Sequence, residues 1–404
     1  MKLKEIELLK HKLETLDLEG DKRVFRVLEQ SAELAHSANL TYPDGDSKNI
    51  TLWCSNDYLG MSKNPEVIKA GVDAMMNYGA GSTGVRSLTG TSTLHIQLEE
   101  VIAELHQKEA AILYNSGYIA NETALNTLSR HLEDLVIFSD ELNHNSIIQG
   151  IRNGKAKKHI FRHNDADHLR ELLSMSDPNV PKLVVFESLY SMDGDFANIR
   201  ELVHIAKEFG ALTYLDEVHA VGIYGKEGRG LAIQENTEID IIEGTLGKAF
   251  GTMGGYIAAS KEIVEFLRQR SFGLIYTTSL PPGIIASAIK SIEIVKQADA
   301  LRQRLKDLTQ MLLQSMKNSG YPIVSDKSHI VALLVGSGEK SSKISDYLLE
   351  NHNILVQAIK YPTVAKGTER LRICALPTMM ESDVSSFLAA LKEVNKKFSL
   401  IYEY

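Results

Sequence analysis

The sequence predicts an α/β protein: a large domain with a mostly parallel sheet flanked by helices, followed by a smaller α+β domain. Short apolar runs alternate with helical patterns through the middle of the chain, which is typical of a parallel sheet covered on both faces. The pattern changes after Pro281-Pro282, and the 404 residues exceed the size at which one hydrophobic core stops growing. We therefore expect an N-terminal helical arm at 1–49, a large domain at 50–290 and a small domain at 291–404.

The N-terminal segment carries apolar residues at helical spacing. The pattern extends from residue 1 to about residue 37, is interrupted at Gly20 and resumes at Phe25, Val27 and Leu28. It predicts a helical arm. The polar stretch 39–48 then predicts a turn, and the apolar run 50–54 predicts the strand that opens the large domain.

Seven short apolar runs predict the strands of the large domain, with helices between most of them. Ligands of such sheets bind beyond the carboxyl ends of the strands, so the chemistry is expected in the loops at that edge. The predicted strands are Ala111–Tyr114, Leu135–Phe138, Lys158–Phe161, Leu183–Phe186, Leu212–Leu215, Ile239–Ile242 and Gly255–Ala259, and the predicted helices include Pro65–Met76, Thr93–Leu105, Ile119–Ser129, Ala166–Met175 and Asn198–Phe209.

The C-terminal part reads as a smaller α+β domain. One long helical stretch is expected from Gly283 to about Gly320. Strand-like runs then occur at Ile330–Val335, Ile354–Gln357 and Leu371–Cys374, before a closing helix at Glu381–Phe398.

The composition narrows the classes of function. A formal net charge of −8 gives no general attraction to nucleic acid or to an anionic membrane, so we expect neither partner. Cys54 and Cys374 are far apart and lack ligand spacing, which predicts neither a disulfide nor a metal site. No apolar run approaches the length of a membrane span, and the charged N-terminus does not resemble a secretory signal. A cytoplasmic location is expected.

Lys248 lies in the glycine-rich stretch Ile241–Gly255, among small and apolar neighbours. A partly buried lysine can lose its proton and act as a nucleophile, so we predict that Lys248 binds a carbonyl cofactor as a Schiff base. The alternative is an ordinary solvated lysine on a glycine-rich loop.

Polar residues follow two of the predicted strands. Asp216 ends one apolar run and His219 follows three residues later; a buried carboxylate there could pair with the protonated nitrogen of a pyridoxal ring. His144, past another strand, could stack over such a ring. The alternatives are a helix cap at Asp216 with a packed histidine, and an exposed histidine in a polar turn at 144.

Phosphate binding calls for backbone donors near small hydroxyl residues. The candidates are Ser116-Gly117-Tyr118 at the start of a helix, Thr245, and Thr277-Thr278. Gly79–Gly84 also satisfies the dinucleotide-binding pattern Gly-x-Gly-x-x-Gly. A predicted helix precedes it where that fold requires a strand, which argues against a nicotinamide enzyme.

Together these residues resemble the α-oxoamine synthases, which are pyridoxal phosphate (PLP) enzymes of fold type I. The resemblance extends from about residue 20 to about residue 395. Its most specific segments are Cys54–Gly60, Phe186–Asp195, Tyr214–Gly222 and Glu243–Gly255.

The resemblance implies a large domain with a seven-stranded sheet, a homodimer with its active site at the subunit interface, and roles for individual residues. Lys248 is implied as the Schiff-base lysine and base, Asp216 as the partner of the ring nitrogen, and His144 as the stacking catalytic histidine. The implied cofactor-binding residues are Ser116, Gly117, Tyr118, His144, Ser191, Asp216, His219, Thr245, Lys248, Thr277 (across the dimer interface) and Thr278.

Within the family, the chain is most similar to the enzymes that condense glycine with succinyl-CoA and release CoA and carbon dioxide. The loop and strand Tyr361–Arg372 support this assignment, as does Arg23, whose guanidinium suits the succinyl carboxylate. The implied substrate-binding residues are Arg23, Asn56, Val85, Ser87, Ser139, Lys158, Thr363 and Arg372.

One departure keeps the acyl donor open. Those enzymes have Thr-Arg-Asn where this chain has Val85-Arg86-Ser87, and the Val85 side chain cannot donate a hydrogen bond. The alternative is a sister acyltransferase that uses acetyl-CoA, a pimeloyl thioester or a fatty acyl-CoA. A non-catalytic interaction protein would not need Lys248, Asp216 and His144 at strand ends.

Overall fold

The computed structural model describes residues 3–18, 24–31 and 33–401. Contacts divide the chain into two compact units. The first unit comprises Met1–Ser55, Met192–Gly194 and Arg304–Tyr404, and the second comprises Asn56–Ser191 and Asp195–Gln303. The domain limits at residues 50 and 290 remain a prediction.

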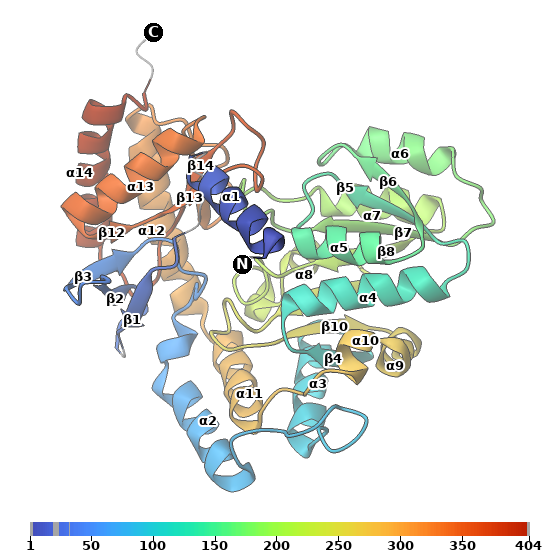
Figure 1. The fold of residues 1–404 in the computed structure, drawn as a ribbon. Helices are drawn as coiled ribbons and strands as arrows, with labels where there is room; N and C mark the ends of the chain where they lie inside the picture. The colour runs from blue at the N-terminus through green and yellow to red at the C-terminus, as the bar shows by residue number, and fades with distance from the viewer. Residues whose placement is uncertain (1–2, 19–23, 32, 402–404) are drawn as a thin grey trace. The chain divides into compact units, whose positions relative to one another are not determined.

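The second unit is built on a seven-stranded sheet with the strand order β4-β10-β9-β8-β7-β5-β6 (Figure 1). Only β10 runs against its neighbours, because its pairings with β4 and β9 are antiparallel while the other pairings are parallel. The predicted mostly parallel sheet is confirmed. Its strands are β4 (Ala110–Tyr114), β5 (Val136–Asp140), β6 (Lys157–Phe161), β7 (Lys182–Glu187), β8 (Leu212–Asp216), β9 (Ile241–Thr245) and β10 (Gly255–Ala259).

Helices of the second unit occur between strands and before the sheet. Residues buried on β4, β5, β7, β8, β9 and β10 form one apolar cluster with residues of α4, α5 and α9. The helices, besides two short 3₁₀ turns at Met61–Lys63 and Lys226–Gly228, are α2 (Pro65–Tyr78), α3 (Thr93–Leu105), α4 (Gly117–His131), α5 (Asn145–Asn153), α6 (Ala166–Ser174), α7 (Ile199–Glu208), α8 (Leu231–Gln234), α9 (Lys261–Arg270), α10 (Phe272–Ile275) and α11 (Pro282–Lys296).

The first unit contains two smaller sheets, with strand orders β1-β2-β3-β12 and β11-β14-β13. A separate apolar cluster joins β11 and β14 to α12, α13 and α14 around Trp53 and Phe387, whose rings stack. The elements are α1 (Lys4–Leu18), β1 (Val27–Gln30), β2 (Ser37–Thr41), β3 (Ser47–Leu52), α12 (Asp299–Asn318), β11 (Ile330–Leu334), α13 (Gly338–His352), β12 (Ile354–Leu355), β13 (Gln357–Ile359), β14 (Arg370–Cys374) and α14 (Glu381–Phe398).

Two expectations about elements were wrong. Of the residues in the predicted helical pattern, Val27 and Leu28 belong to the strand β1, and Phe25 lies just before it. Leu28 pairs with Leu40 of β2 and packs on the core of that sheet. Phe25 and Val27 remain exposed, so alternation across a sheet, and not a helical stripe, explains their spacing. The long helix predicted from Gly283 is two helices, α11 and α12, separated by residues 297–298.

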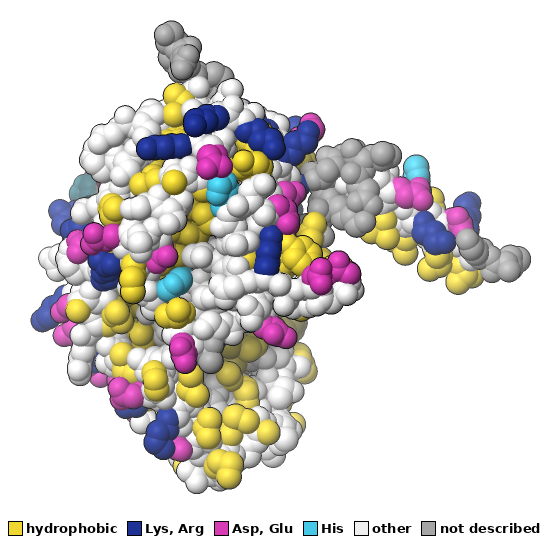
Figure 2. All heavy atoms as spheres, turned by 90° about the vertical axis from the view of Figure 1, so that its left-hand side faces the viewer, with side chains coloured by type: hydrophobic (Ala, Val, Ile, Leu, Met, Phe, Trp, Pro, Cys, Tyr) yellow, Lys and Arg dark blue, Asp and Glu magenta, His cyan; other side chains and the backbone are white. Residues whose placement is uncertain are grey.

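The apolar residues of α1 do form a helix, and Ile6, Leu9, Leu13 and Leu16 remain exposed on it (Figure 2). Among the residues that the structure describes, no helix is long and apolar enough to cross a bilayer.

Candidate active site

Lys248 lies in the tight connection between β9 and β10. Thr245 ends β9, and its hydroxyl donates to the Gly254 carbonyl at 2.9 Å. Gly251 has φ +64°, and a Cβ there would lie 2.2 Å from the Ser62 backbone nitrogen. The connection is therefore closely packed against the chain, and Lys248 is half-buried rather than fully solvated.

The Lys248 amine belongs to a chain of polar contacts. Its Nζ lies 3.0 Å from His219 Nε2, and His219 Nδ1 lies 2.7 Å from the Tyr58 hydroxyl. Tyr58 and His219 are both buried. If Tyr58 donates to Nδ1, the Nε2–H of His219 can donate to a neutral amine; if Lys248 is protonated, the ring takes the opposite tautomer. This arrangement can carry a proton to and from Lys248.

Asp216 lies in a row of three buried carboxylates. It ends β8 and pairs in register with Glu187 of β7 and Glu243 of β9, so all three side chains lie on one face of the sheet. Their exposed fractions are 3% for Glu187, 4% for Asp216 and 0% for Glu243. Burial raises the pKa of both glutamates well above the ordinary value, and the neighbouring Asp216 raises each further.

Asn121 connects the row of carboxylates to helix α4, on which it lies. Its Nδ2 donates to Asp216 at 2.8 Å and lies 3.2 Å from Glu243, while its carbonyl oxygen accepts from the Tyr214 hydroxyl at 2.8 Å. The Val218 backbone N–H also donates to Asp216 at 2.9 Å. These two donors hold the Asp216 side chain in place, where a carboxylate can pair with a cationic partner.

His144 precedes α5 and lies close to the carboxylate row. Its backbone N–H donates to Glu187 at 2.5 Å, and its Nδ1 lies 2.8 Å from the Ser146 hydroxyl. The Tyr118 ring meets the imidazole edge-on at 6.2 Å. The imidazole keeps solvent access, yet partial desolvation lowers its pKa, so His144 is neutral at neutral pH.

The N-terminus of helix α4 adds a candidate anion site to these residues. Ser116 caps the 15-residue helix α4 by accepting from the Ile119 N–H at 3.2 Å, which leaves the following amides available for an anion. Gly117 lies close to β9, since a Cβ there would be 2.9 Å from Glu243 and 3.2 Å from Thr245 Cβ. The backbone can thus approach a phosphate closely at this position.

PLP fits these residues. The cofactor has an aldehyde, a ring nitrogen that is basic and a phosphate, and the second unit offers an amine, a buried carboxylate and a helix N-terminus for them. Glu243 Oε1 is buried without a hydrogen-bond partner among the described residues, so the row of carboxylates can form a further hydrogen bond.

The segment that carries Val85 and Ser87 is bound to the segment that carries Thr277 and Thr278. Val85 and Thr278 form an isolated antiparallel bridge, and the Asn115 side chain donates to the Thr278 carbonyl at 2.9 Å. Ser279 reinforces the contact through its hydroxyl, which donates to the Gly90 carbonyl at 2.6 Å. A segment with two predicted substrate-binding residues is therefore held directly against a segment with predicted phosphate-binding residues.

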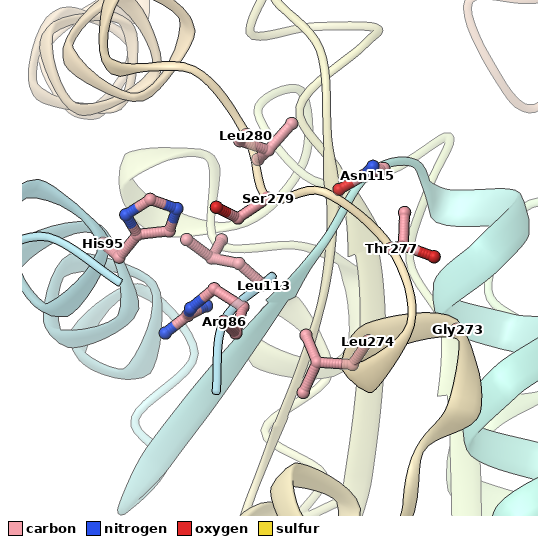
Figure 3. Close-up of a pocket in the computed structure, with 9 residues that line it drawn as sticks. All are labelled: Arg86, His95, Leu113, Asn115, Gly273, Leu274, Thr277, Ser279 and Leu280. Atoms are coloured by element: carbon pink, nitrogen blue, oxygen red, sulfur yellow. The ribbon is translucent and has the colours of Figure 1, made fainter. Parts of the chain in front are cut away.

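A small cavity of about 10 Å³, room for about one water molecule, lies beside this junction (Figure 3). Arg86 and His95 line it, and Arg86 Nη2 and His95 Nε2 have no protein partner among the described residues. The other Arg86 amino group pairs with Glu99 at 2.8 Å. Burial and Arg86 lower the pKa of His95 to about 4, so this histidine is neutral.

The other predicted substrate residues occupy varied positions. Asn56 Oδ1 lies 3.2 Å from the Tyr58 hydroxyl, and the buried Ser139 hydroxyl, on β5, accepts from Asn143 at 2.9 Å. Lys158 is exposed on the edge strand β6, and Ser191 is buried. Their roles remain predictions.

Three predicted substrate residues belong to the first unit of the chain. Arg372 is buried on β14, between Ala332 of β11 and Gln357 of β13, and Thr363 is exposed in the loop before that strand. Arg23 lies outside the described residues.

Burial raises the pKa of the Cys54 thiol to about 11, which makes this cysteine a poor nucleophile.

Sequence reasoning did not assign roles to Tyr58, Asn121, Glu187 and Glu243. The two glutamates carried a usable signal, since each is an acidic residue directly after an apolar strand run. Tyr58 and Asn121 gave no such signal, because only the fold brings them to His219 and Asp216.

A charged histidine joins the end of β5 to the loop that carries Asp195. His163 Nδ1 lies 3.0 Å from Asp140, and Nε2 lies 2.8 Å from Asp195, so both ring nitrogens must donate. The two carboxylates overcome the effect of burial and raise the pKa of His163 to about 10. The imidazolium thereby anchors the loop that continues to His144.

Replacing His163 by Gln is expected to lower the free energy of unfolding in a pH-dependent way. The stabilisation by His163 is fully present below about pH 6.5, declines above it and is lost once the pH passes about 10, because the folded state alone holds the proton in that window. Chemical denaturation across that range measures it. His204→Gln is the control, since that side chain is 71% exposed; a constant gap between H163Q and wild type across the range would contradict the prediction.

Comparisons with known proteins show the family of the chain. The aminotransferase class I and II family profile matches residues 48–391. The chain is 44% identical to 5-aminolevulinate synthase of Rickettsia bellii over 384 residues, covering 95% of this chain and 92% of that protein. It is 47% identical to the Rhodobacter capsulatus enzyme, covering 90% of each chain. The mitochondrial erythroid-specific enzyme of Danio rerio is 46% identical, and 62% of its length is covered.

Solved structures give the same fold. A serine palmitoyltransferase from S. paucimobilis with a bound PLP compound has a TM-score of 0.91 and 29% sequence identity, covering 99% of this chain and all of that one. An 8-amino-7-oxononanoate synthase from Francisella tularensis has a TM-score of 0.74 and 26% identity, covering 87% of this chain and 98% of that one.

Proposed function

Because the chain belongs to the α-oxoamine synthase group within the aminotransferase class I and II family, we propose that it condenses glycine with succinyl-CoA to give 5-aminolevulinate, CoA and carbon dioxide. It is a PLP-dependent acyltransferase, as its 5-aminolevulinate synthase relatives are. The observation that carries the proposal is the half-buried Lys248 amine, which is hydrogen-bonded to His219. The buried Asp216 belongs to the same unit.

PLP supplies an electron sink that stabilises negative charge on the amino-acid carbon. Lys248 would hold its aldehyde carbon, Asp216 its protonated ring nitrogen, and the amides after Ser116 its phosphate. His144 would cover the ring. Thr245, Gly117, Tyr118, His219, Ser191 and Thr278 are the further contacts proposed from the family resemblance.

Lys248 is proposed to move the proton of the glycine Cα. To accept it, the amine must be neutral, and His219 Nε2 can take the proton that Lys248 gives up. Tyr58 completes the relay at Nδ1. The lowered pKa of His144 keeps its imidazole neutral, so it can hold or donate a hydrogen bond at the reacting carbonyl without adding charge.

The proposed substrate contacts divide by charge. Arg372 would bind the glycine carboxylate and Arg23 the succinyl carboxylate, because a guanidinium binds a carboxylate through two parallel hydrogen bonds. Thr363, Asn56, Val85, Ser87, Ser139 and Lys158 are proposed as the remaining substrate contacts. We propose a homodimer in which Thr277 serves the phosphate of the partner subunit. A cytoplasmic location remains a prediction.

Succinyl-CoA is expected to be the best acyl donor with glycine, by about 10-fold or more over acetyl-, pimeloyl- and palmitoyl-CoA. Discrimination of this size corresponds to one charge-assisted hydrogen-bonded pair, which only the succinyl carboxylate can form. Release of CoA measures it for each thioester, with glycine, alanine, serine and threonine as acceptors.

Arg23→Leu should raise KM for succinyl-CoA about 10- to 100-fold and leave KM for glycine unchanged. Lys22→Leu is the control for the loss of a neighbouring positive charge. Equal or faster turnover with another thioester would instead identify a sister acyltransferase, the candidate that Val85 favours.

A further inference from the structure

Glu243 is the least solvated member of the carboxylate row, and its one donor is the most distant of those that the row accepts from. Glu187 receives the His144 N–H, and Asp216 receives N–H groups from Val218 and Asn121. Glu243 Oε2 lies 3.2 Å from Asn121 Nδ2, the longest of the contacts that this nitrogen makes. Glu243 Oε1 has no hydrogen-bond partner among the described residues.

The Asn121 amide cannot serve all of its neighbours. Its two N–H hydrogens face three acceptors: Asp216 at 2.8 Å, the Ser146 hydroxyl at 3.1 Å and Glu243 at 3.2 Å. The two nearer groups take the hydrogens in the best geometry. A carboxylate at 243 would then be buried with almost no donor, which costs far more than burying a neutral acid.

The register of the strands places Glu243 beside the anion that can accept its proton. Paired residues on neighbouring strands lie about 5 Å apart, so Asp216 and Glu243 cannot both be ionised cheaply in a buried site. Burial makes the largest contribution to the raised pKa of Glu243, and Asp216 raises this pKa further, while Lys248 lowers it. Asp216 already accepts two N–H donors, so the single proton of the pair belongs on Glu243.

We propose that Glu243 is a neutral carboxylic acid whose O–H donates to Asp216, and that it thereby positions the carboxylate facing the cofactor nitrogen. Only one part of the proposal rests on the proposed function, namely that the group facing Asp216 is the cofactor nitrogen. The protonation of Glu243 follows from the row itself. Glu243 is a positioning residue, because it acts on the cofactor through Asp216.

The proposal has a consequence for stability. An acid with a raised pKa in the folded state takes up a proton on folding, so stability falls as the pH rises from its ordinary pKa toward the raised value. The titratable groups facing Glu243 are Asp216, Tyr214, Glu187, Lys248 and Tyr256. All of them remain in a Glu243 variant, so the change is assignable to this residue.

The first test uses Glu243→Gln without cofactor, because Gln is neutral and can donate from the same position. At neutral pH, the infrared C=O stretching band of protonated carboxylic acids should be weaker in the variant by the contribution of one acid. The unfolding free energy of the variant should also fall less steeply as the pH rises, because the variant takes up about one proton fewer on folding than the wild type. Glu238→Gln, five residues earlier with an 81% exposed side chain, should change neither. If E243Q loses no acid band and keeps the wild-type slope, Glu243 is ionised and the proposal is overturned.

The second test measures PLP binding by the visible absorption of the bound cofactor. E243Q should bind PLP within about threefold of wild type, since the donor to Asp216 is retained. Binding weakened tenfold or more, in a variant with a native circular dichroism spectrum, would mean that a negative charge is needed and would overturn the proposal. Failure of the wild type itself to bind PLP would instead overturn the proposed function, while the infrared and pH results would still decide the state of Glu243.

Discussion

Lys248→Ala should reduce turnover by about 10⁴-fold or more, the largest effect expected for any single change in this protein. The substitution removes the side chain that is proposed both to anchor the cofactor covalently and to move the glycine proton, and each of these roles contributes strongly to catalysis. His219 would also lose the amine at 3.0 Å. The fold should persist, because the side chain is half-buried and its turn is held by backbone hydrogen bonds.

Two measurements should change together for Lys248→Ala. Release of CoA from succinyl-CoA with glycine should fall to background, and the visible absorption band of the lysine-bound cofactor should disappear. Lys261→Ala on the exposed start of α9 is the matched control and should leave both unchanged. Turnover near the wild-type rate in purified Lys248→Ala would refute the assignment of this lysine.

Asp216→Asn should lower kcat by about 100- to 1,000-fold, the range seen when one preorganised charged group is lost from an active site. The amide has nearly the same shape, but it cannot compensate a protonated ring nitrogen. It would also place an N–H opposite donors from Val218 or Asn121. PLP should bind more weakly, with an altered absorption spectrum, because its ring would lose the proton.

The pH dependence separates charge from shape in this variant. The loss in Asp216→Asn should shrink at lower pH, where the ring nitrogen can be protonated without a carboxylate. Asp167→Asn on the exposed surface of α6 controls for the substitution itself. A loss that is the same at every pH, with an unchanged cofactor spectrum, would show that Asp216 acts only in packing.

Local sequence patterns predicted the sheet because its strands are short, apolar and separated by clear helical periodicity. The limits of β10 and α3 agree with the predicted ones, whereas β9 begins two residues later than predicted and includes Thr245. Near the N-terminus the same reasoning failed, since Val27 and Leu28 suit either period and only pairing with β2 decides.

The site was predictable where one residue carries the signal and unpredictable where the fold combines several. Lys248 and Asp216 stand out in the sequence because a charged group in apolar surroundings is unusual. The contact of Tyr58 with His219 joins residues 161 positions apart, and no local pattern encodes it. The register of β7, β8 and β9 is equally non-local, so the row of acids could not be foreseen from the individual strands.

That register also protects the strands against mispairing. One residue before each acid of the row, Phe186, Leu215 and Ile242 form a second row that is completely apolar and buried on the opposite face. A slip of one residue between any two of these strands would drive a carboxylate into hydrocarbon and turn an isoleucine, leucine or phenylalanine toward the polar face. The three acids therefore also make every neighbouring alignment of the central strands costly, so the pairing that aligns the sheet is the same pairing that places Asp216 for its proposed role.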